Sequence, residues 1–340
     1  MVHVAGDTVT ERDLATLIAF QVDTVGMNDD DDDDDDTFDQ IFLESPHKQE
    51  ADATIQQMVV LNPQPEDSSS DINNLKFETV RLLPEACVPA VMKLYTTFTG
   101  GEALNLSVEE IAHFQALGKD ATQAQIETTL GHVLQGRFLE YQQRGLAGIS
   151  PYRRAKKHDF YPGKELIEKT QKSTLLHEHA AKFGQYIAAW PHGTDPQQCA
   201  QETFGWMNYN LDNAPSIALY HRIIWTDPTY RKTKFLMHRT YYVSSGHNSV
   251  QQLGFAVPVG RVPNTTRSSS VTEAATDPPT TTKTGLLVGF SSRTSTDKVT
   301  GFGGSAKRAI GSRIMGGRIA ENMEALRKVS ASHKKKQHKN

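Results

Sequence analysis

Several segments in the second half of the chain have the side-chain pattern of strands and also carry polar and aromatic groups that could bind a ligand. A strand alternates its side chains between two faces, so residues two apart share a face. An arginine or histidine on an apolar face must be paired or solvated, because burying an unpartnered charge costs free energy. A pocket lined by such groups would meet that need, and so would cross-strand pairs on an open sheet. The ligand-binding residues we expect are Tyr220, Arg222, His238, Tyr242 and Arg293.

The stretch SSGHNS between two of these segments invites a catalytic interpretation. Ser245, His247 and Asn248 have the side chains of a nucleophile, a base and an orienting group. Three neighbours on one turn cannot adopt the geometry of a catalytic triad, whose members come from separate elements. Gly246 and Asn248 are the residue types that a hairpin turn requires. We predict a turn here; in the alternative, His247 and Asn248 contact a ligand at the mouth of a pocket.

A second candidate site follows the last strand-like segment, where TSTDKVTGFGGSAKR leads into a predicted helix. The amino terminus of a helix attracts anions, and basic side chains here add positive charge. Ser305, Lys307 and Arg308 are therefore candidates for binding a phosphate or a phospholipid headgroup. The glycine spacing matches neither the dinucleotide-binding fingerprint nor the phosphate-binding loop. In the structural alternative, the glycines permit a tight turn and Ser305 caps the helix.

Metal-binding and catalytic assignments find little support in the residue spacing. LLHEHAAKF lacks the second histidine that a zinc-protease helix places four residues after the first, because position 181 is alanine. We therefore predict no metal site. An enzymatic hypothesis would use His221 or His238 as a general acid or base, with a strand arginine polarising a carbonyl or phosphate. Nothing in the spacing requires that chemistry, so we assign no catalytic residue and no cofactor.

The elements that would position these groups are helices first and strands afterwards. Ser107 and Glu110 have the spacing of a capping box at the start of a first helix. An apolar stripe over 126–141 indicates a second helix, and a third is predicted over about 164–190. After Pro191 the period changes from near 3.6 to near 2. The segments predicted as an antiparallel five-strand meander are 203–211, 215–225, 233–243, 249–259 and 285–292.

Charge divides the chain into an acidic beginning and a basic remainder. Residues 1–80 contain 20 of the 40 acidic residues and three basic ones. The eight consecutive aspartates Asp29–Asp36 repel one another, as in a solvated spacer; a basic protein partner is the alternative. The organisation we predict is a disordered acidic region over 1–76, an α+β domain over 77–332 with a helical part at 104–191 and the sheet and terminal helix at 202–330, and a basic tail over 333–340.

The remaining composition bounds the setting. Cys87 and Cys199 are too few for a disulfide framework and suit a reducing compartment. There is no apolar run of 18 residues and no basic start followed by an apolar core, so we expect neither a transmembrane segment nor a secretory signal. We expect an intracellular, most simply cytoplasmic, protein. Nucleic acid is not an expected partner, because no recognised nucleic-acid-binding pattern accompanies the basic residues.

Helices, then an antiparallel meander, then one long terminal helix over about 305–329 is an order that resembles the later part of the START-like helix-grip superfamily. The resemblance covers roughly residues 104–329 and rests on element order, without a motif. It implies that the terminal helix lies across a curved sheet and closes an apolar cavity, for which the helix offers an apolar stripe containing Met315, Ile319, Met323 and Leu326. The front of the chain departs from the superfamily, because no strand is predicted before the helices.

These observations predict an α+β domain that acts as a non-enzymatic binding module for a lipid or other hydrophobic small molecule. The alternative is an interaction or scaffold protein that acts through its acidic and basic ends, with the folded core presenting them. The two hypotheses place the function on different parts of the chain, the strands in the first and the charged termini in the second.

Overall fold

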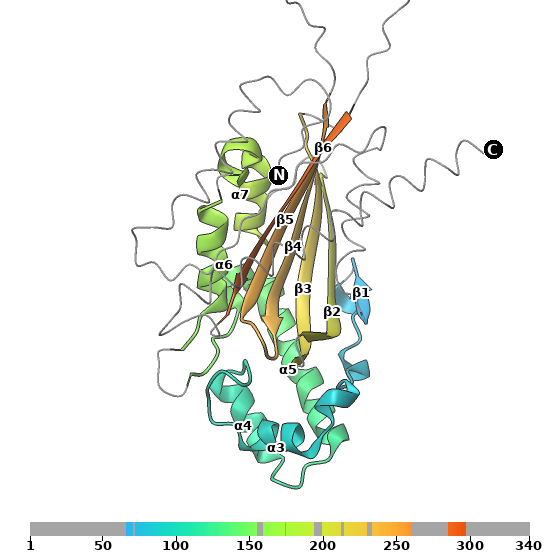
Figure 1. Cartoon of the computed structure of the whole chain (residues 1–340), viewed down its shortest axis with the longest axis vertical. Helices are drawn as coiled ribbons and strands as arrows, with labels where there is room; N and C mark the ends of the chain where they lie inside the picture. The colour runs from blue at the N-terminus through green and yellow to red at the C-terminus, as the bar shows by residue number, and fades with distance from the viewer. Residues whose placement is uncertain are drawn as a thin grey trace, which may run out of the picture.

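The computed structural model describes residues 66–70, 72–154, 159–173, 175–193, 199–211, 214–229, 233–259 and 285–296. They form an α+β fold in which helices pack against an antiparallel sheet (Figure 1). The predicted fold class is therefore confirmed in outline. The aspartate run Asp29–Asp36, the terminal helix predicted over 305–329 and the basic tail over 333–340 lie outside these residues.

The sheet is a meander of six strands whose spatial order follows the chain order. The strands are β1 (Asp67–Ser69), β2 (Ala200–Leu211), β3 (Ala214–Thr226), β4 (Lys234–Val243), β5 (Ser249–Val259) and β6 (Gly285–Ser295). Strands β2 to β6 correspond to the five predicted segments. The prediction of five strands is wrong by one. The additional strand is β1, which lies within the stretch 1–76 that was predicted to be disordered, and it pairs with residues 204–206 of β2. Its sequence, one aspartate and two serines, has none of the β-branched or aromatic residues that favour strands.

The described helices, and the short turns that join them, lie before β2 in the chain. They are α3 (Pro89–Thr97), α4 (Val108–Ala116), α5 (Gln123–Arg144), α6 (Pro162–Gln171) and α7 (Ala181–Ala189), with turns η1 (Ile72–Asn74), η2 (Phe77–Thr79), η3 (Pro84–Ala86), η4 (Gly145–Gly148) and η5 (Leu175–His179). Figure 1 shows α3 and α4 beyond one end of the long strands, and α6 and α7 beside the sheet. The helices thus lie around one side and one end of a tall, narrow sheet.

Local sequence determines where two of these helices begin and end. The Ser107 side chain accepts from the Glu110 backbone N–H, and the Glu110 carboxylate accepts from the Ser107 N–H at 2.7 Å, so the predicted capping box is present at α4. Thr122 and Gln125 form a second capping box at the start of α5. Gly145 ends α5 with a φ of 59°, a left-handed value that favours glycine.

The third predicted helix, over 164–190, is two helices rather than one. Helix α6 ends at Gln171, and the π-type turn η5 separates it from α7. The intervening sequence KST contains a serine and a threonine, whose hydroxyl groups compete with the helical backbone for hydrogen bonds. The apolar stripe continues across the break, which is why the sequence pattern suggested a single helix.

The helices cover one face of the sheet, here called the inner face, and a bulge decides which residues reach it. The inner face includes Leu219, His221, Ile223 and Trp225 of β3 and Phe235, Met237 and Arg239 of β4. The β3–β4 register shifts between Leu219 and Tyr220. As a result, Tyr241 and Tyr242 both face the helices. The Tyr241 ring stacks on Tyr141 of α5 with 3.9 Å between centroids, and the Arg137 guanidinium lies 4.3 Å from the Tyr242 ring. The alternation that placed Tyr242 beside His238 is therefore wrong at this position.

A buried polar network joins α5 to the inner face. Arg239, 0% exposed, donates from Nε and Nη2 to the Gln251 Oε1 at 3.1 and 3.0 Å and from Nη1 to the Tyr141 hydroxyl at 3.3 Å. An arginine can only donate, so the Tyr141 oxygen accepts and its hydroxyl proton is directed to His221 Nδ1, 3.0 Å away. Nε2 of His221 then carries the ring proton and faces the Glu202 carboxylate at 3.4 Å.

The charge states follow from burial. Removal from water lowers the pKa of His221 to about 4, against the opposing effect of Glu202, so the ring is neutral near pH 7. For Glu202, burial works against ionisation, but hydrogen bonds from His221, Tyr186 and Trp190 hold the pKa of the carboxyl below its ordinary value. The network therefore contains a neutral histidine between a buried tyrosine and an ionised glutamate.

Replacing Tyr141 by phenylalanine tests whether this network holds the helix to the sheet. Tyr141→Phe leaves Arg239 and His221 each without one hydrogen bond, and we expect the free energy of unfolding to fall by about 1–3 kcal/mol. Urea denaturation measures the change. The matched control is Tyr161→Phe, which removes a hydroxyl from an exposed ring and should change stability by less than about 0.5 kcal/mol. Equal effects in the two variants would contradict the role of the network.

Candidate functional site

The outer face of the sheet, opposite the helices, carries a row of polar side chains that begins at Thr203 of β2, which pairs with Arg222 of β3. Arg222 of β3 pairs with His238 of β4, His238 with Gln252 of β5, and Gln252 with Ser292 of β6. Neighbouring strands are about 4.8 Å apart, so the side chains from Arg222 to Ser292 form a continuous line about 14 Å long. These four are called the polar row below.

The polar row is buried and its hydrogen-bonding capacity is not used. His238 and Ser292 are 3% and 1% exposed, and Arg222 and Gln252 are half-buried. Arg222 Nε, His238 Nδ1, Gln252 Oε1 and Ser292 Oγ are buried atoms without a hydrogen-bond partner. Buried polar groups in folded proteins are nearly always hydrogen-bonded. Unpartnered atoms also occur on the inner face, among them the hydroxyls of Tyr241 and Tyr242, so the distinguishing feature of the polar row is that its four atoms lie in one line.

Aromatic and apolar side chains border the polar row on both sides. The Tyr220 ring stacks on the His238 imidazole with 5.1 Å between centroids and an angle of 18°, and the Arg222 guanidinium lies 5.3 Å from the same ring. Tyr220 belongs to a small buried cluster with Met207, Ala218 and Val243. Beyond the row, on the other side, Ile224 and Leu236 are paired across β3 and β4. The polar row thus lies between the Tyr220 cluster and the Ile224–Leu236 pair, on a face that also carries Thr240 and Thr294.

The polar row carries one positive charge that no acid balances. Among the residues that the structure describes, no carboxylate forms an ion pair within 4.0 Å of Arg222. Burial lowers the pKa of Arg222 below its ordinary value, yet a guanidinium remains protonated in proteins. Burial and the nearby charge of Arg222 lower the pKa of His238 to about 3. His238 is therefore a neutral donor and acceptor beside a cation.

The structure brings together three of the predicted ligand-binding residues and separates the others. Tyr220, Arg222 and His238 lie side by side on the outer face. Tyr242 lies on the inner face because of the bulge, and Arg293 is also there, donating from Nη1 to the Lys169 carbonyl at 2.7 Å. The two groups cannot line one pocket, because the sheet itself stands between them.

His247 and Asn248 lie in the turn between β4 and β5, where a turn was predicted. Gly246 has a φ of 87°, which explains the glycine. The Asn248 Oδ1 accepts from Arg154 Nη2 at 3.0 Å, and the His247 carbonyl accepts from Asn105 Nδ2 at 2.7 Å. These contacts anchor the turn to the loop before α4, through Asn105, and to the segment between η4 and α6, through Arg154. The candidate anion-binding residues Ser305, Lys307 and Arg308 lie outside the described residues.

Sequence reasoning did not select Gln252 or Ser292. Each stands in a pair of identical residues, Gln251-Gln252 and Ser291-Ser292, so a polar residue falls on both faces whichever way the strand is oriented. Only the register with β4 shows that Gln252 and Ser292 continue the line from His238. The signal available in the sequence was the doubling itself, which predicts polar groups on both faces of one sheet.

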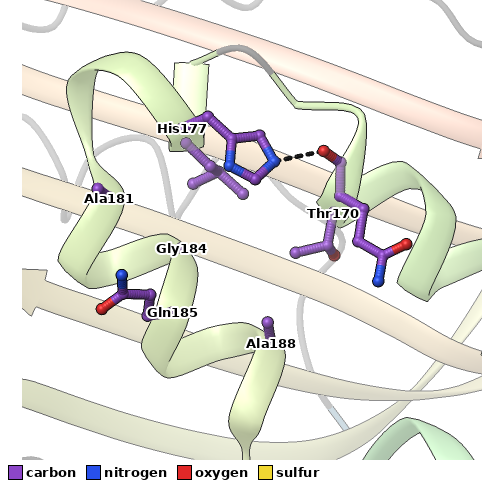
Figure 2. A pocket seen from close by; sticks show the side chains of 8 residues that line it. Thr170, His177, Ala181, Gly184, Gln185 and Ala188 are labelled. Carbon is purple, nitrogen blue, oxygen red and sulfur yellow. Dashed lines mark hydrogen bonds between the residues drawn. The ribbon is translucent and has the colours of Figure 1, made fainter.

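A small pocket lies away from the polar row, between the end of α6 and α7 (Figure 2). Its volume is about 140 Å³, and it is lined by Thr170, Gln171, Leu176, His177, Ala181, Gly184, Gln185 and Ala188. The His177 ring bonds the Gln171 carbonyl at its rim. Pockets for drug-sized ligands begin near 300 Å³, so this one accommodates no more than a short side chain.

Comparisons with known proteins give no family for the chain. No family model, no curated protein and no solved structure matches it. Within the described ranges, no group of three or more acidic, histidine or cysteine side chains has the arrangement of a metal site. None of the helices described is both long enough and apolar enough to cross a membrane. The functional argument therefore rests on the geometry of the outer face.

The buried state of His238 predicts a specific pH dependence of stability. Its pKa is about 3 in the folded chain and near 6.5 when unfolded, so between these values the unfolded chain binds more protons and stability falls as the pH decreases. We expect the free energy of unfolding to fall between pH 7 and pH 5 in both proteins, and the fall to be about 1–2 kcal/mol smaller in His238→Gln than in the wild type. Urea denaturation at the two pH values measures this. His132→Gln, at an exposed position, should behave like the wild type; an unchanged pH dependence in His238→Gln would show that His238 titrates normally.

Proposed function

We propose that the protein is a non-enzymatic binding module for a lipid or other hydrophobic small molecule, and that the outer face of the sheet holds the ligand. One observation carries the proposal: a line of four buried polar atoms without partners lies beside aromatic and apolar side chains, among them Tyr220, Ile224 and Leu236. Ligand sites in proteins typically combine apolar and aromatic lining with a few placed polar groups. The same combination would be costly to maintain as plain structure.

The inner face is a poorer candidate, because its side chains are already in contact with one another. The Tyr141 ring is stacked between Tyr241 at 3.9 Å and Trp190 at 4.6 Å. His221 and Arg239 already form hydrogen bonds with the Tyr141 hydroxyl. A ligand placed there would have to displace a close-packed helix, at a cost in packing and hydrogen bonds. This argues for the outer face over the helix-covered one.

The polar row supports binding better than catalysis. A serine nucleophile needs a base within hydrogen-bond reach. Ser292 and His238 lie on β6 and β4, with Gln252 of β5 between them, which separates their backbones by about 10 Å. His221 lies on the helix-covered inner face and its Nδ1 is bonded to Tyr141, so it is not placed to act as a base on a substrate at the polar row. A row that holds a ligand without transforming it accounts for these positions.

Ligand capture by the full-length chain tests the proposal. We expect native mass spectrometry to show one apolar molecule per chain, recoverable by organic extraction, and the emptied protein to take up a fluorescent lipid. Val250→Trp enlarges a half-buried side chain on the outer face, beside Thr240 and Thr294. It should weaken uptake by about tenfold or more, since 1.4 kcal/mol of lost contact has that effect.

The control for this experiment fills the small pocket between α6 and α7. Ala188→Leu occupies the pocket of Figure 2 and should leave uptake unchanged. If Ala188→Leu abolished uptake and Val250→Trp did not, the ligand would belong to the pocket. A folded wild-type chain that carries no apolar molecule and takes up no lipid would reject the binding function and favour an interaction role for the charged ends.

A further inference from the structure

On the basis of the proposed function, we propose that the ligand is an amphipathic acid and that Arg222 and His238 bind its carboxylate. The inference goes beyond the binding of an apolar molecule, because it specifies the chemistry of the polar end and the two side chains that recognise it. It depends on the outer face being the binding face, and the experiment below separates the failure of one from the failure of the other.

The charge of Arg222 is the first argument. Its Nε is buried without a partner, and the described part of the chain places no acid in ion-pair contact with its guanidinium. The face of Tyr220, 5.3 Å away, provides only a cation–π contact. The Arg222 side chain is half-buried, and a partly buried charge without an anion is costly; a ligand carboxylate would reduce that cost, whereas a neutral ligand would leave it. The site therefore discriminates by charge.

The geometry of the pair is the second argument. Arg222 and His238 are directly opposite each other on β3 and β4, so their side chains leave the sheet on the same side about 5 Å apart. The Nε and an adjacent Nη of a guanidinium match the two oxygens of a carboxylate. His238 is neutral near pH 7 and its Nδ1 is unpartnered, so the ring can place its proton there and donate to the same anion.

The surroundings argue for an acid with an apolar body rather than for a small inorganic anion. On one side of the pair lie Tyr220 and the cluster around Met207, and on the other side lie Ile224 and Leu236. The aliphatic side chains and the Tyr220 ring gain free energy by covering apolar ligand surface, while the unpartnered Tyr220 hydroxyl can still donate or accept a hydrogen bond. Ser292 lies three strands from Arg222, about 14 Å away, so the polar row also has room for a second polar group of the ligand.

The test compares a fluorescent long-chain fatty acid with its methyl ester on the delipidated, full-length chain near pH 7. The two probes differ by one charge and share the apolar body. We expect the wild type to bind the acid at least about tenfold more tightly than the ester. Arg222→Met keeps an unbranched side chain without the charge, and it should lower the affinity for the acid to that for the ester while leaving the ester unaffected.

The matched control is Arg144→Met. It removes the same charge from an exposed position on α5, where Arg144 pairs with Glu140, and should leave the preference for the acid intact. If Arg222→Met does not fold, the wild-type comparison of acid with ester decides the matter alone. Equal affinity of the wild type for both probes would overturn the carboxylate assignment and leave the binding function standing. A preference for the acid that persists in folded Arg222→Met would overturn the role of Arg222, and failure to bind either probe would overturn the binding function itself.

Discussion

The buried guanidinium of Arg239 is the constraint around which helices and sheet are arranged. It donates to Gln251 of β5 and Tyr141 of α5, and Nη2 lies 3.5 Å from the Ile187 carbonyl of α7. The Tyr141 hydroxyl in turn forms a hydrogen bond with His221 of β3. A charge in the interior must keep all its partners, because removing one leaves the others buried and unsatisfied. The relative placement of α5, α7 and three strands is thus fixed by one side chain, and apolar packing of Phe138, Phe183 and their neighbours fills the space that this placement leaves.

The same four strands carry two polar lines back to back, and their contrast is the strongest sign of function. Consecutive residues at 221–222, 238–239, 251–252 and 292–293 send one polar side chain to each face. On the inner face, groups from α5, α6 and α7 satisfy the line: Tyr141 bonds His221 and Arg239, Thr170 bonds Gln251, and the Lys169 carbonyl accepts from Arg293. On the outer face the polar row lacks such partners. The hydroxyls of Tyr241 and Tyr242 on the inner face are also without partners, so the contrast lies between the two lines of paired residues and not between the two faces as a whole.

Local patterns predicted most elements, and non-local pairing decided what they missed. Capping boxes and stripes located α4 and α5, and period-two segments located β2 to β6, because these signals lie within a few adjacent residues. Strand β1 exists through its pairing with β2 alone, and the bulge that turns Tyr242 to the helices depends on the register between β3 and β4. Alternation found Tyr220, Arg222 and His238 because all three lie on the same side of the register shift, where β3 and β4 keep one register. Gln252 and Ser292 required the register, which neighbouring residues do not encode.

The two polar lines also act on each other through charge. Neither Arg239 on the inner face nor Arg222 on the outer face has a carboxylate in ion-pair contact among the described residues, and Arg239 is satisfied by neutral oxygen atoms only. Hydrogen bonds to neutral acceptors offset the free-energy cost of removing a guanidinium from water, but they leave its charge in place. The two arginines differ in their surroundings. On the inner face the ionised Glu202 lies 3.4 Å from His221, which shares the Tyr141 hydroxyl with Arg239. On the outer face Arg222 lies over the Tyr220 ring, and its positive charge adds to burial in lowering the pKa of His238. The inner charge is therefore held in a network that includes an acid, whereas the outer charge has a neutral histidine and an aromatic ring beside it.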